Sequence, residues 1–332
     1  GGNAPFTPIA ITLRVADTVL EDAGIGDLWR HARLRWLDST IGLDQEVYPP
    51  YTPIEVRERD FSVLGRTVRL ADNGLLSGIA STFTRNVDGA AGTPQELLAE
   101  PMRWVVRMDN DQPVIWQSDG PRIVSRAPGA VSWEAASNAG PLGSVCRATL
   151  ECDGYVNFRL TLQARQAARV GDVALEIPLR REVAKYMMGL GRKGGFRPAR
   201  WEWKWDAARA NNQLWIGDVN AGLSLKLKHI EERWDLYNLR ESGPYRDWAN
   251  GRHGGCTVEE VGTDQVVIRA YTGPIEAVAG HELRFNFGLL STPVKTLDRG
   301  HWDWRYFHRG TAAPVAEAAD GGATVINLHQ GD

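Results

Sequence analysis

The chain has 332 residues, of which 43% are hydrophobic and 24% charged, and its formal net charge is -3. This length allows one large domain or two ordinary ones, each with a sizeable buried core. The charge is close to neutral and no basic cluster is interleaved with aromatic residues, which argues against a nucleic-acid-binding surface. The apolar runs fall far short of the roughly 20 residues of a membrane helix, so no membrane partner is expected.

The first residues, GGNAPFTPIA, contain neither the charged nor the apolar region of a signal peptide, so the sequence does not indicate a compartment. The cysteines are Cys146, Cys152 and Cys256. On one strand, at about 3.3 Å per residue, the first two would lie about 20 Å apart, beyond the ~7 Å between Cα atoms that a disulfide allows. Their odd number and spacing argue against a disulfide framework and a cysteine metal site, and we expect no metal or cofactor.

Short alternating segments separated by turn residues predict an all-β fold. Clear examples are LSLKLK at 223–228, QVVIRAY at 265–271 and ELRFNFGLL at 282–290, and Asp-Gly or Asn-Gly pairs recur between such segments. Regularly punctuated strands are typical of a large antiparallel β-sandwich. We expect one supersandwich of the galactose-mutarotase type or two smaller sandwiches. The best candidates for helices are short, at 93–99 and 181–188.

One hairpin can be predicted in detail. Cys146, Ala148 and Leu150 are the inward positions before Asp153-Gly154, and Val156, Phe158 and Leu160 are those after it. A two-residue loop would place Leu150 opposite Asn157 and mix the two faces. A three-residue loop at 152–154 pairs Leu150 with Val156 and places Gly154 at the left-handed position that such loops favour.

GLGRKGG at 189–195 contains the glycine spacing of a dinucleotide-binding loop, but Pro198 and alternating tryptophans follow it instead of a helix. We therefore predict a tight connection between closely approaching backbones. In WEWKWD, Trp201, Trp203 and Trp205 share one face of a strand, opposite a charged face. This pattern fits a sugar-stacking platform or a half-buried strand, and we predict a core or interdomain row.

The segment HWDWRYFH at 301–308 contains the better candidates for ligand contact. Trp302 and Trp304 alternate beside Arg305 and His308, so aromatic rings and hydrogen-bond donors are mixed at a predicted domain edge. A linker-like stretch follows, and then TVINLHQGD predicts a short buried strand. The expected organisation is a sandwich over 1–310, a linker over 311–323 and, over 324–332, the first strand of a second domain.

Several segments together resemble the N-terminal β-sandwich region of glycoside hydrolase family 123-like proteins. They are RHARLRWLDSTIG, LADNGLLSGI, LAEPMRWVV, LEIPL, KYMMGLGRKGGFRPARWEWKWD, LWIGDVNAGLSLKLK and LLSTPVKTLDRGHWDWRYFH, in this order. The resemblance implies that the sandwich precedes a catalytic (β/α)8 barrel whose first strand is VINLHQGD. The barrel is then a partner of the sandwich within the same protein.

The resemblance also implies a reaction, the exo-acting removal of N-acetylhexosamine, typically β-linked N-acetylgalactosamine. In that family the acetamido group of the substrate is the nucleophile, assisted by an Asp-Glu pair on later barrel strands. No residue of this chain matches that pair, so none is assigned a catalytic role. His329, Gln330 and Asp332 would follow the first barrel strand, on the side where barrel active sites form.

We therefore expect a non-catalytic domain that packs against the barrel and helps to shape its carbohydrate site. An alternative is a stand-alone carbohydrate-binding module, which requires two or more coplanar exposed tryptophans on one concave face. A third reading is a complete β-sandwich enzyme, such as a mutarotase-like epimerase or a lyase. That reading requires histidines or carboxylates that converge in one cleft.

Overall fold

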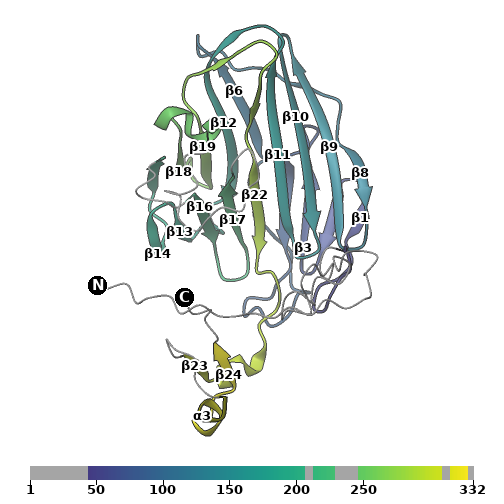
Figure 1. Ribbon diagram of the computed structural model, residues 1–332, viewed down its shortest axis with the longest axis vertical. Helices are drawn as coiled ribbons and strands as arrows, with labels where there is room; N and C mark the ends of the chain where they lie inside the picture. The colour runs from purple at the N-terminus through teal and green to yellow at the C-terminus, as the bar shows by residue number, and fades with distance from the viewer. Residues whose placement is uncertain (1–43, 206–211, 229–245, 309–314, 328–332) are drawn as a thin grey trace, which may run out of the picture. The chain divides into compact units, whose positions relative to one another are not determined.

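The computed structural model describes residues 44–205, 212–228, 246–308 and 315–327, and antiparallel strands dominate this part of the chain (Figure 1). Its helices are short: α2 (Arg246–Ala249), α3 (Val315–Asp320) and the 3-10 turns η3 (Asn250–Arg252) and η4 (Arg299–Asp303). The predicted all-β antiparallel sandwich is confirmed.

The largest sheet contains eleven strands of the described chain. In spatial order they are β14 (Arg192–Phe196), β13 (Tyr186–Gly189), β16 (Gln213–Gly217), β17 (Gly222–Leu227), β22 (Phe287–Thr292), β11 (Tyr155–Ala164), β10 (Leu142–Glu151), β9 (Ala130–Ala139) and β7 (Gln117–Ser118), with β8 (Arg122–Arg126) also on β9 and β21 (Glu282–Arg284) also on β11. The long strands β9, β10 and β11 run side by side in Figure 1.

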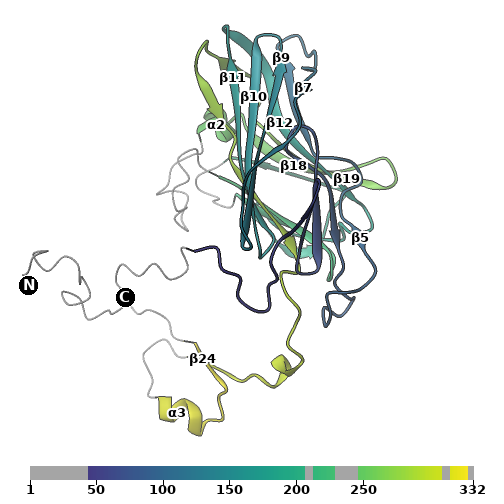
Figure 2. The ribbon, with the colours of Figure 1, turned by 90° about the vertical axis from the view of Figure 1, so that its right-hand side faces the viewer.

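Two smaller sheets complete the sandwich. One contains β15 (Arg200–Lys204), β18 (Gly255–Val261), β19 (Gln265–Tyr271), β12 (Ala168–Arg180), β20 (Ile275–Ala277) and β6 (Arg103–Met108). The other contains β1 (Glu55–Arg57), β2 (Asp60–Val63), β3 (Arg66–Leu70), β4 (Leu76–Ser81) and β5 (Gln95–Glu96). Figure 2 shows β12, β18 and β19 in a layer apart from β9, β10 and β11.

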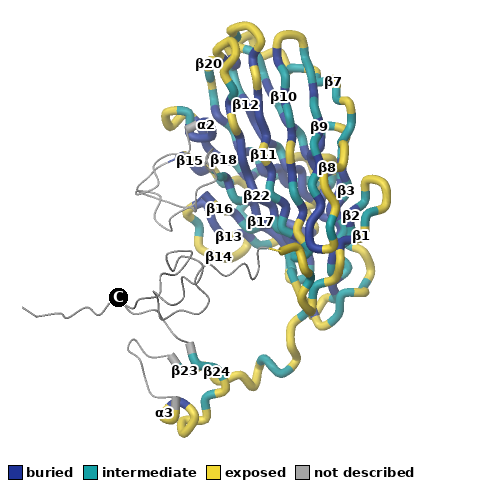
Figure 3. Tube along the Cα trace, turned by 45° about the vertical axis from the view of Figure 1, so that its right-hand side comes forward, coloured by how far each residue is buried: buried dark blue, intermediate teal, exposed yellow. Residues whose placement is uncertain are grey.

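Both smaller sheets share one hydrophobic core with the largest sheet. The rings of Phe61 on β2 and Trp133 on β9 lie 5.4 Å apart, and those of Trp104 on β6 and Phe285 beside β22 lie 5.2 Å apart. Along β10 every second residue is buried, as the period of a strand requires (Figure 3). The inward face of the large sheet is therefore the centre of the core.

The hairpin of β10 and β11 has the predicted register. Leu150 pairs with Val156, Ala148 with Phe158 and Cys146 with Leu160. Gly154 has a φ of 86°, and its N–H donates to the carbonyl of Glu151 at 2.8 Å. The three-residue loop is confirmed, since only that loop keeps the apolar positions of both strands on one face.

The tryptophan row is part of the core, as predicted. Trp203 and Trp205 are 6% and 5% exposed, and their rings lie 4.8 Å apart. Trp201 is half-buried and packs against the same core. GLGRKGG spans the end of β13, the turn at Leu190 and Gly191, and most of β14, so a strand stands where a nucleotide-binding loop would need a helix.

Both helix predictions were wrong. Residues 93–99 contain β5, and Leu97 and Leu98 are buried in the core. Residues 181–188 contain a turn and the first residues of β13. In both places neighbouring strands supply the backbone hydrogen bonds, for example from the N–H of Arg180 to the carbonyl of Leu97, so pairing outweighs local helix propensity.

The last described elements are β23 (Tyr306–His308) and β24 (Val325–Asn327), which pair in parallel. The helix α3 lies between them in sequence, inside the stretch predicted as a linker. Val325 and Ile326 are half-buried. The predicted division into a sandwich at 1–310, a linker at 311–323 and a barrel strand at 324–332 stays a prediction.

Candidate functional site

Leu297–Trp304 leads from the sandwich to β23 and contains two of the predicted contact residues. The N–H of Leu297 donates to the carbonyl of Val87 at 2.8 Å, and Arg299 Nη2 lies 3.2 Å from Asp88 Oδ2. Asp298 begins η4 by accepting a hydrogen bond from the N–H of Gly300 at 2.8 Å. These contacts hold the segment against the loop between β4 and β5.

One side of this segment borders a cavity of about 930 Å³, which we call the polar groove. It is lined by Arg85, Asn86, Asp88, Gln95, Lys185, Tyr186, Asp218, Val219, Asn220, Leu297, Asp298, Arg299, His301 and Trp302. Most of these side chains can form hydrogen bonds. Trp302 is 84% exposed, so its ring is available to a ligand.

The other side borders a cavity of about 870 Å³, which we call the apolar groove. It is lined by Pro50, Val87, Val219, Thr292, Pro293, Val294, Lys295, Thr296, Leu297, Asp298, His301, Trp304 and Tyr306. Trp304 and Tyr306 are 44% and 63% exposed, and their rings lie 6.4 Å apart. The two grooves share Val219, Leu297, Asp298 and His301, so they are neighbours.

The structure therefore separates the predicted contact residues. Trp302 lines the polar groove and Trp304 the apolar groove. Arg305 lines neither, and its backbone N–H bonds the hydroxyl of Thr324 at 2.8 Å. His308 lies in β23, where its backbone pairs with Asn327. His329, Gln330 and Asp332 lie outside the described residues.

The carboxylates of the polar groove are stabilised as anions. Burial acts to raise the pKa of Asp218, but hydrogen bonds from Lys185 and the N–H of Val219, with the charges of Lys185 and Arg85, outweigh it and lower that pKa. A hydrogen bond from the Thr84 hydroxyl, together with Arg299, lowers the pKa of Asp88. Neither carboxyl has the raised pKa of a general acid at neutral pH.

Residues 54–293 match the family model described as "Glycoside hydrolase 123, third domain", which covers more than half of the chain. The chain belongs to the glycoside hydrolase 123 family. The family resemblance seen in the sequence is thereby confirmed, and the matched part is a domain of a glycoside hydrolase. None of the curated proteins matches the sequence significantly.

The solved structures to which this glycoside hydrolase 123 domain is similar share little sequence with it. A galactose mutarotase related enzyme from Lactobacillus acidophilus is 7% identical, with a TM-score of 0.43 over 74% of this chain and 98% of that one. An aldose epimerase homologue from C. elegans is 8% identical, with a TM-score of 0.40 over 73% and 98%. An α-N-acetylgalactosaminidase from Bifidobacterium bifidum, solved with GalNAc, is 8% identical, with a TM-score of 0.42 over 70% and 36%.

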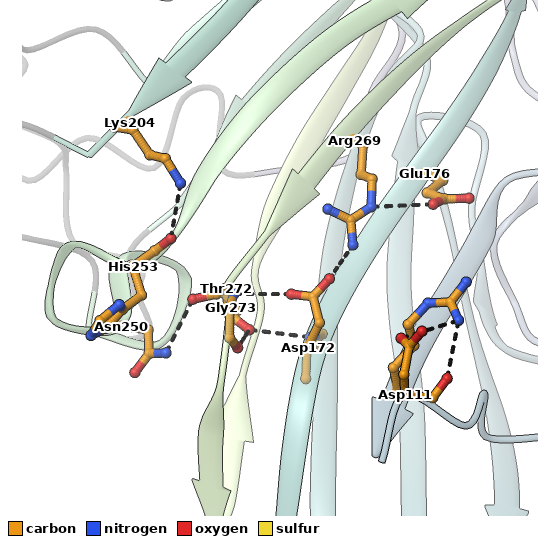
Figure 4. Close-up of polar contacts among 11 residues, drawn as sticks. Asp111, Asp172, Glu176, Lys204, Asn250, His253, Arg269, Thr272 and Gly273 are labelled. Atoms are coloured by element: carbon orange, nitrogen blue, oxygen red, sulfur yellow. Dashed lines mark hydrogen bonds and ion pairs between the residues drawn. The ribbon is translucent and has the colours of Figure 1, made fainter. Parts of the chain in front are cut away.

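A second polar cluster lies on the outer face of the sheet that contains β12 and β19 (Figure 4). Arg269 is ion-paired with Asp172, and its Nε lies 3.3 Å from Glu176 Oε1. Asp172 also accepts from the N–H of Gly273 at 2.9 Å, and Arg103 binds Glu176 at 2.9 Å. Because each carboxylate is compensated by an arginine, we interpret this cluster as structural.

Within the described ranges of this glycoside hydrolase 123 domain, no group of three or more His, Cys, Asp or Glu residues could hold a metal ion. In the same residues no helix is long and apolar enough to cross a membrane.

Sequence reasoning did not identify most of the polar groove. Arg85, Lys185 and Asp218 come from three separate connections and are far from Trp302 in the chain. Each is a polar residue near a turn, which is the commonest pattern on any protein surface. No local signal distinguishes them, since only strand pairing brings these connections together.

Proposed function

We propose that this chain is a non-catalytic domain of a glycoside hydrolase that acts on N-acetylhexosamine-containing glycans. In this proposal it packs against a catalytic (β/α)8 barrel in the same protein and forms one side of the carbohydrate site. The family membership supports the glycoside hydrolase assignment.

The observation that carries the proposal is the apolar groove beside β23. Val219, Leu297 and Tyr306 are 61%, 51% and 63% exposed. Contiguous exposed apolar residues usually mark a surface that is covered by a partner. The parallel pair β23 and β24, with α3 between them, supports the barrel as that partner, because parallel strands are joined through helical crossovers and their sheets are normally covered on both faces.

In the same proposal Trp302, Trp304, Arg305 and His308 face the carbohydrate, with His329 and Asp332 as further neighbours. Exposed indole rings supply flat apolar surfaces, and Arg305 adds hydrogen-bond donors. The stand-alone binding module is less well supported. Among the described tryptophans, the two large exposed rings of Trp302 and Trp304 line different grooves, and Trp203 and Trp205 are buried.

The catalytic assignment is tested with a chromogenic N-acetylgalactosaminide. We expect no hydrolysis above the buffer rate by the purified 332-residue chain and clear hydrolysis by the protein that also contains the barrel. Clear turnover by the chain alone would overturn the proposal.

The packing assignment is tested by placing a charge in the apolar groove of the protein that contains the barrel. Leu297→Asp should lower the Tm and the activity of that protein, because a buried unpaired carboxylate is unfavourable. Val261→Asp is the matched control, since Val261 is 49% exposed and lies at the end of β18, outside both grooves. Equal effects of the two substitutions would argue against packing at this groove.

A further inference from the structure

We infer that the polar groove binds an acidic sugar residue, one that carries a carboxylate or a sulfate group. This inference rests on the proposed function, and it adds the class of glycan that the domain recognises. The groove combines three features that favour such a ligand: a suitable size, an exposed ring, and an excess of hydrogen-bond donors next to a cation.

The size and the ring favour a saccharide. Small-molecule sites commonly have volumes of about 300–1,000 Å³, and the polar groove has about 930 Å³. Trp302 is 84% exposed on one side of it, and Tyr186 also lines it. A flat exposed ring covers the apolar face of a pyranose while the hydroxyl groups of that sugar reach polar side chains.

The carboxylates of the groove already have partners. Asp218 binds Lys185 Nζ at 2.5 Å and the N–H of Val219 at 2.8 Å. Asp88 accepts from the Thr84 hydroxyl at 2.6 Å and lies near Arg299, and Asp298 accepts from the N–H of Gly300. The carboxylate oxygens that could accept hydrogen bonds from a ligand are therefore largely occupied by donors of the protein itself.

Several side-chain N–H donors of the polar groove, in contrast, have no acceptor of the described chain bound to them. Within the part of the chain that the structure describes, the side chains of Asn86 and Gln95 make no hydrogen bond, and the guanidinium of Arg85 acts on Asp218 through its charge without a hydrogen bond to it. A guanidinium has five N–H donors and no acceptor, whereas each amide offers two donors and a carbonyl oxygen that accepts. The excess of donors therefore comes from Arg85, and a ligand that complements Arg85 must supply acceptors.

The charges favour an anion among such ligands. Over the whole groove the cations Arg85, Lys185 and Arg299 balance the carboxylates of Asp88, Asp218 and Asp298. At the Asp218 end, Arg85 and Lys185 both act on one carboxylate, so a local excess of one positive charge remains there. The planar fork of an arginine matches two oxygens of a carboxylate or sulfate. A neutral sugar could bind Asn86 and Gln95 but would leave the guanidinium of Arg85 to water.

The test measures binding of three tetrasaccharides to the purified chain by calorimetry. They are a sulfated chondroitin tetrasaccharide, its unsulfated counterpart, which keeps the carboxylates, and neutral chitotetraose. We expect the acidic ligands to bind at least about tenfold more tightly than the neutral one, as charge-assisted hydrogen bonds allow. If the unsulfated form also binds tightly, the carboxylate is the recognised group. If only the sulfated form binds tightly, the recognised group is the sulfate.

Variants locate the site. Arg85→Gln should weaken binding of the acidic tetrasaccharides about tenfold and remove most of the salt dependence of that binding. Trp302→Ala should weaken binding of all three ligands. Arg57→Gln and Ile115→Ala are matched controls, because both residues are highly exposed and lie outside the groove. Arg85 and Trp302 are exposed, so unchanged circular dichroism should confirm that their variants fold.

Three outcomes would overturn the inference: equal affinity for acidic and neutral ligands, acidic binding that Arg85→Gln leaves unchanged, or no binding of any of the three. None of these outcomes decides the non-catalytic assignment of the proposed function, which fails instead if the isolated chain hydrolyses the chromogenic substrate.

Discussion

At the scale of single residues, Arg66 is the most unusual side chain of the core. It is 1% exposed, and burial lowers its pKa to about 10, so it remains charged at neutral pH. Its guanidinium donates to the carbonyls of Leu64, Asp153, Ser291 and Val294 at 2.8–2.9 Å. One side chain of β3 thereby fixes the β10–β11 loop and the end of β22.

We expect Arg66→Met to lower the free energy of unfolding by about 3 kcal/mol or more, because the carbonyls lose their donor inside the protein. Urea unfolding measures the change. Arg57→Met is the control, and it should cost about 0.5 kcal/mol or less because the Arg57 side chain is 84% exposed. Similar losses for both variants would contradict this role of Arg66.

Glu260 gives the stability a predictable dependence on pH. A hydrogen bond from Arg197 lowers the pKa of Glu260 below its ordinary value of 4.5, and the charges of Arg181 and Arg197 add to this effect. The folded state therefore binds the proton less readily than the unfolded state. The resulting stability is present above about pH 4.5 and disappears as the pH falls through the lowered pKa.

Glu260→Gln should accordingly lower the Tm at pH 7, and the difference from the parent should shrink toward pH 3. Thermal unfolding at a series of pH values measures it. Glu259→Gln serves as the neighbouring control, since among the described residues the ion pair of Glu259 is with the exposed Arg200, at 3.4 Å. A Tm difference that is independent of pH would exclude the Arg197 interaction as its source.

At the scale of elements, the hairpin of β13 and β14 explains the glycines of GLGRKGG. Gly189 has a φ of 107°, and a Cβ there would clash with the backbone carbonyl of Gln213 on β16. Gly191 has a φ of 75°, with open space around the position of a Cβ. The first glycine allows a close approach of two strands, and the second only allows the turn.

These two positions form a matched pair. Gly191→Ala should cost about 1 kcal/mol, the conformational cost of a left-handed residue. Gly189→Ala should cost about 1–3 kcal/mol more, because a strand must also shift. Denaturant unfolding of both variants checks this, and equal losses would show that no steric clash exists at Gly189.

At the scale of the whole molecule, the sheets depend on one another because they share a core. Phe61 of the β1–β5 sheet packs on Trp133, which in turn packs on Phe158 at 6.1 Å. We expect Phe61→Ala to cost about 3–5 kcal/mol and to shift the tryptophan fluorescence and far-UV circular dichroism transitions together. Separate transitions would show that the β1–β5 sheet unfolds alone.

The sequence by itself determined the local features of this protein. Alternation identified the buried face of the Trp201–Trp205 strand, and the apolar positions around Gly154 fixed the register of β10 and β11. Both follow from the two-residue period of a strand and from the φ that one glycine allows. The helix predictions at 93–99 and 181–188 failed because hydrogen bonds from distant strands outweigh local propensity.

Only the tertiary structure decided which connections share one groove. Arg85, Lys185, Asp218 and Trp302 lie on separate connections, and the pairing order of the strands brings them together. The structure also assigned Trp302 and Trp304, two residues apart, to different grooves. Periodicity specifies the face on which a side chain lies, but the position of one connection relative to another depends on long-range packing.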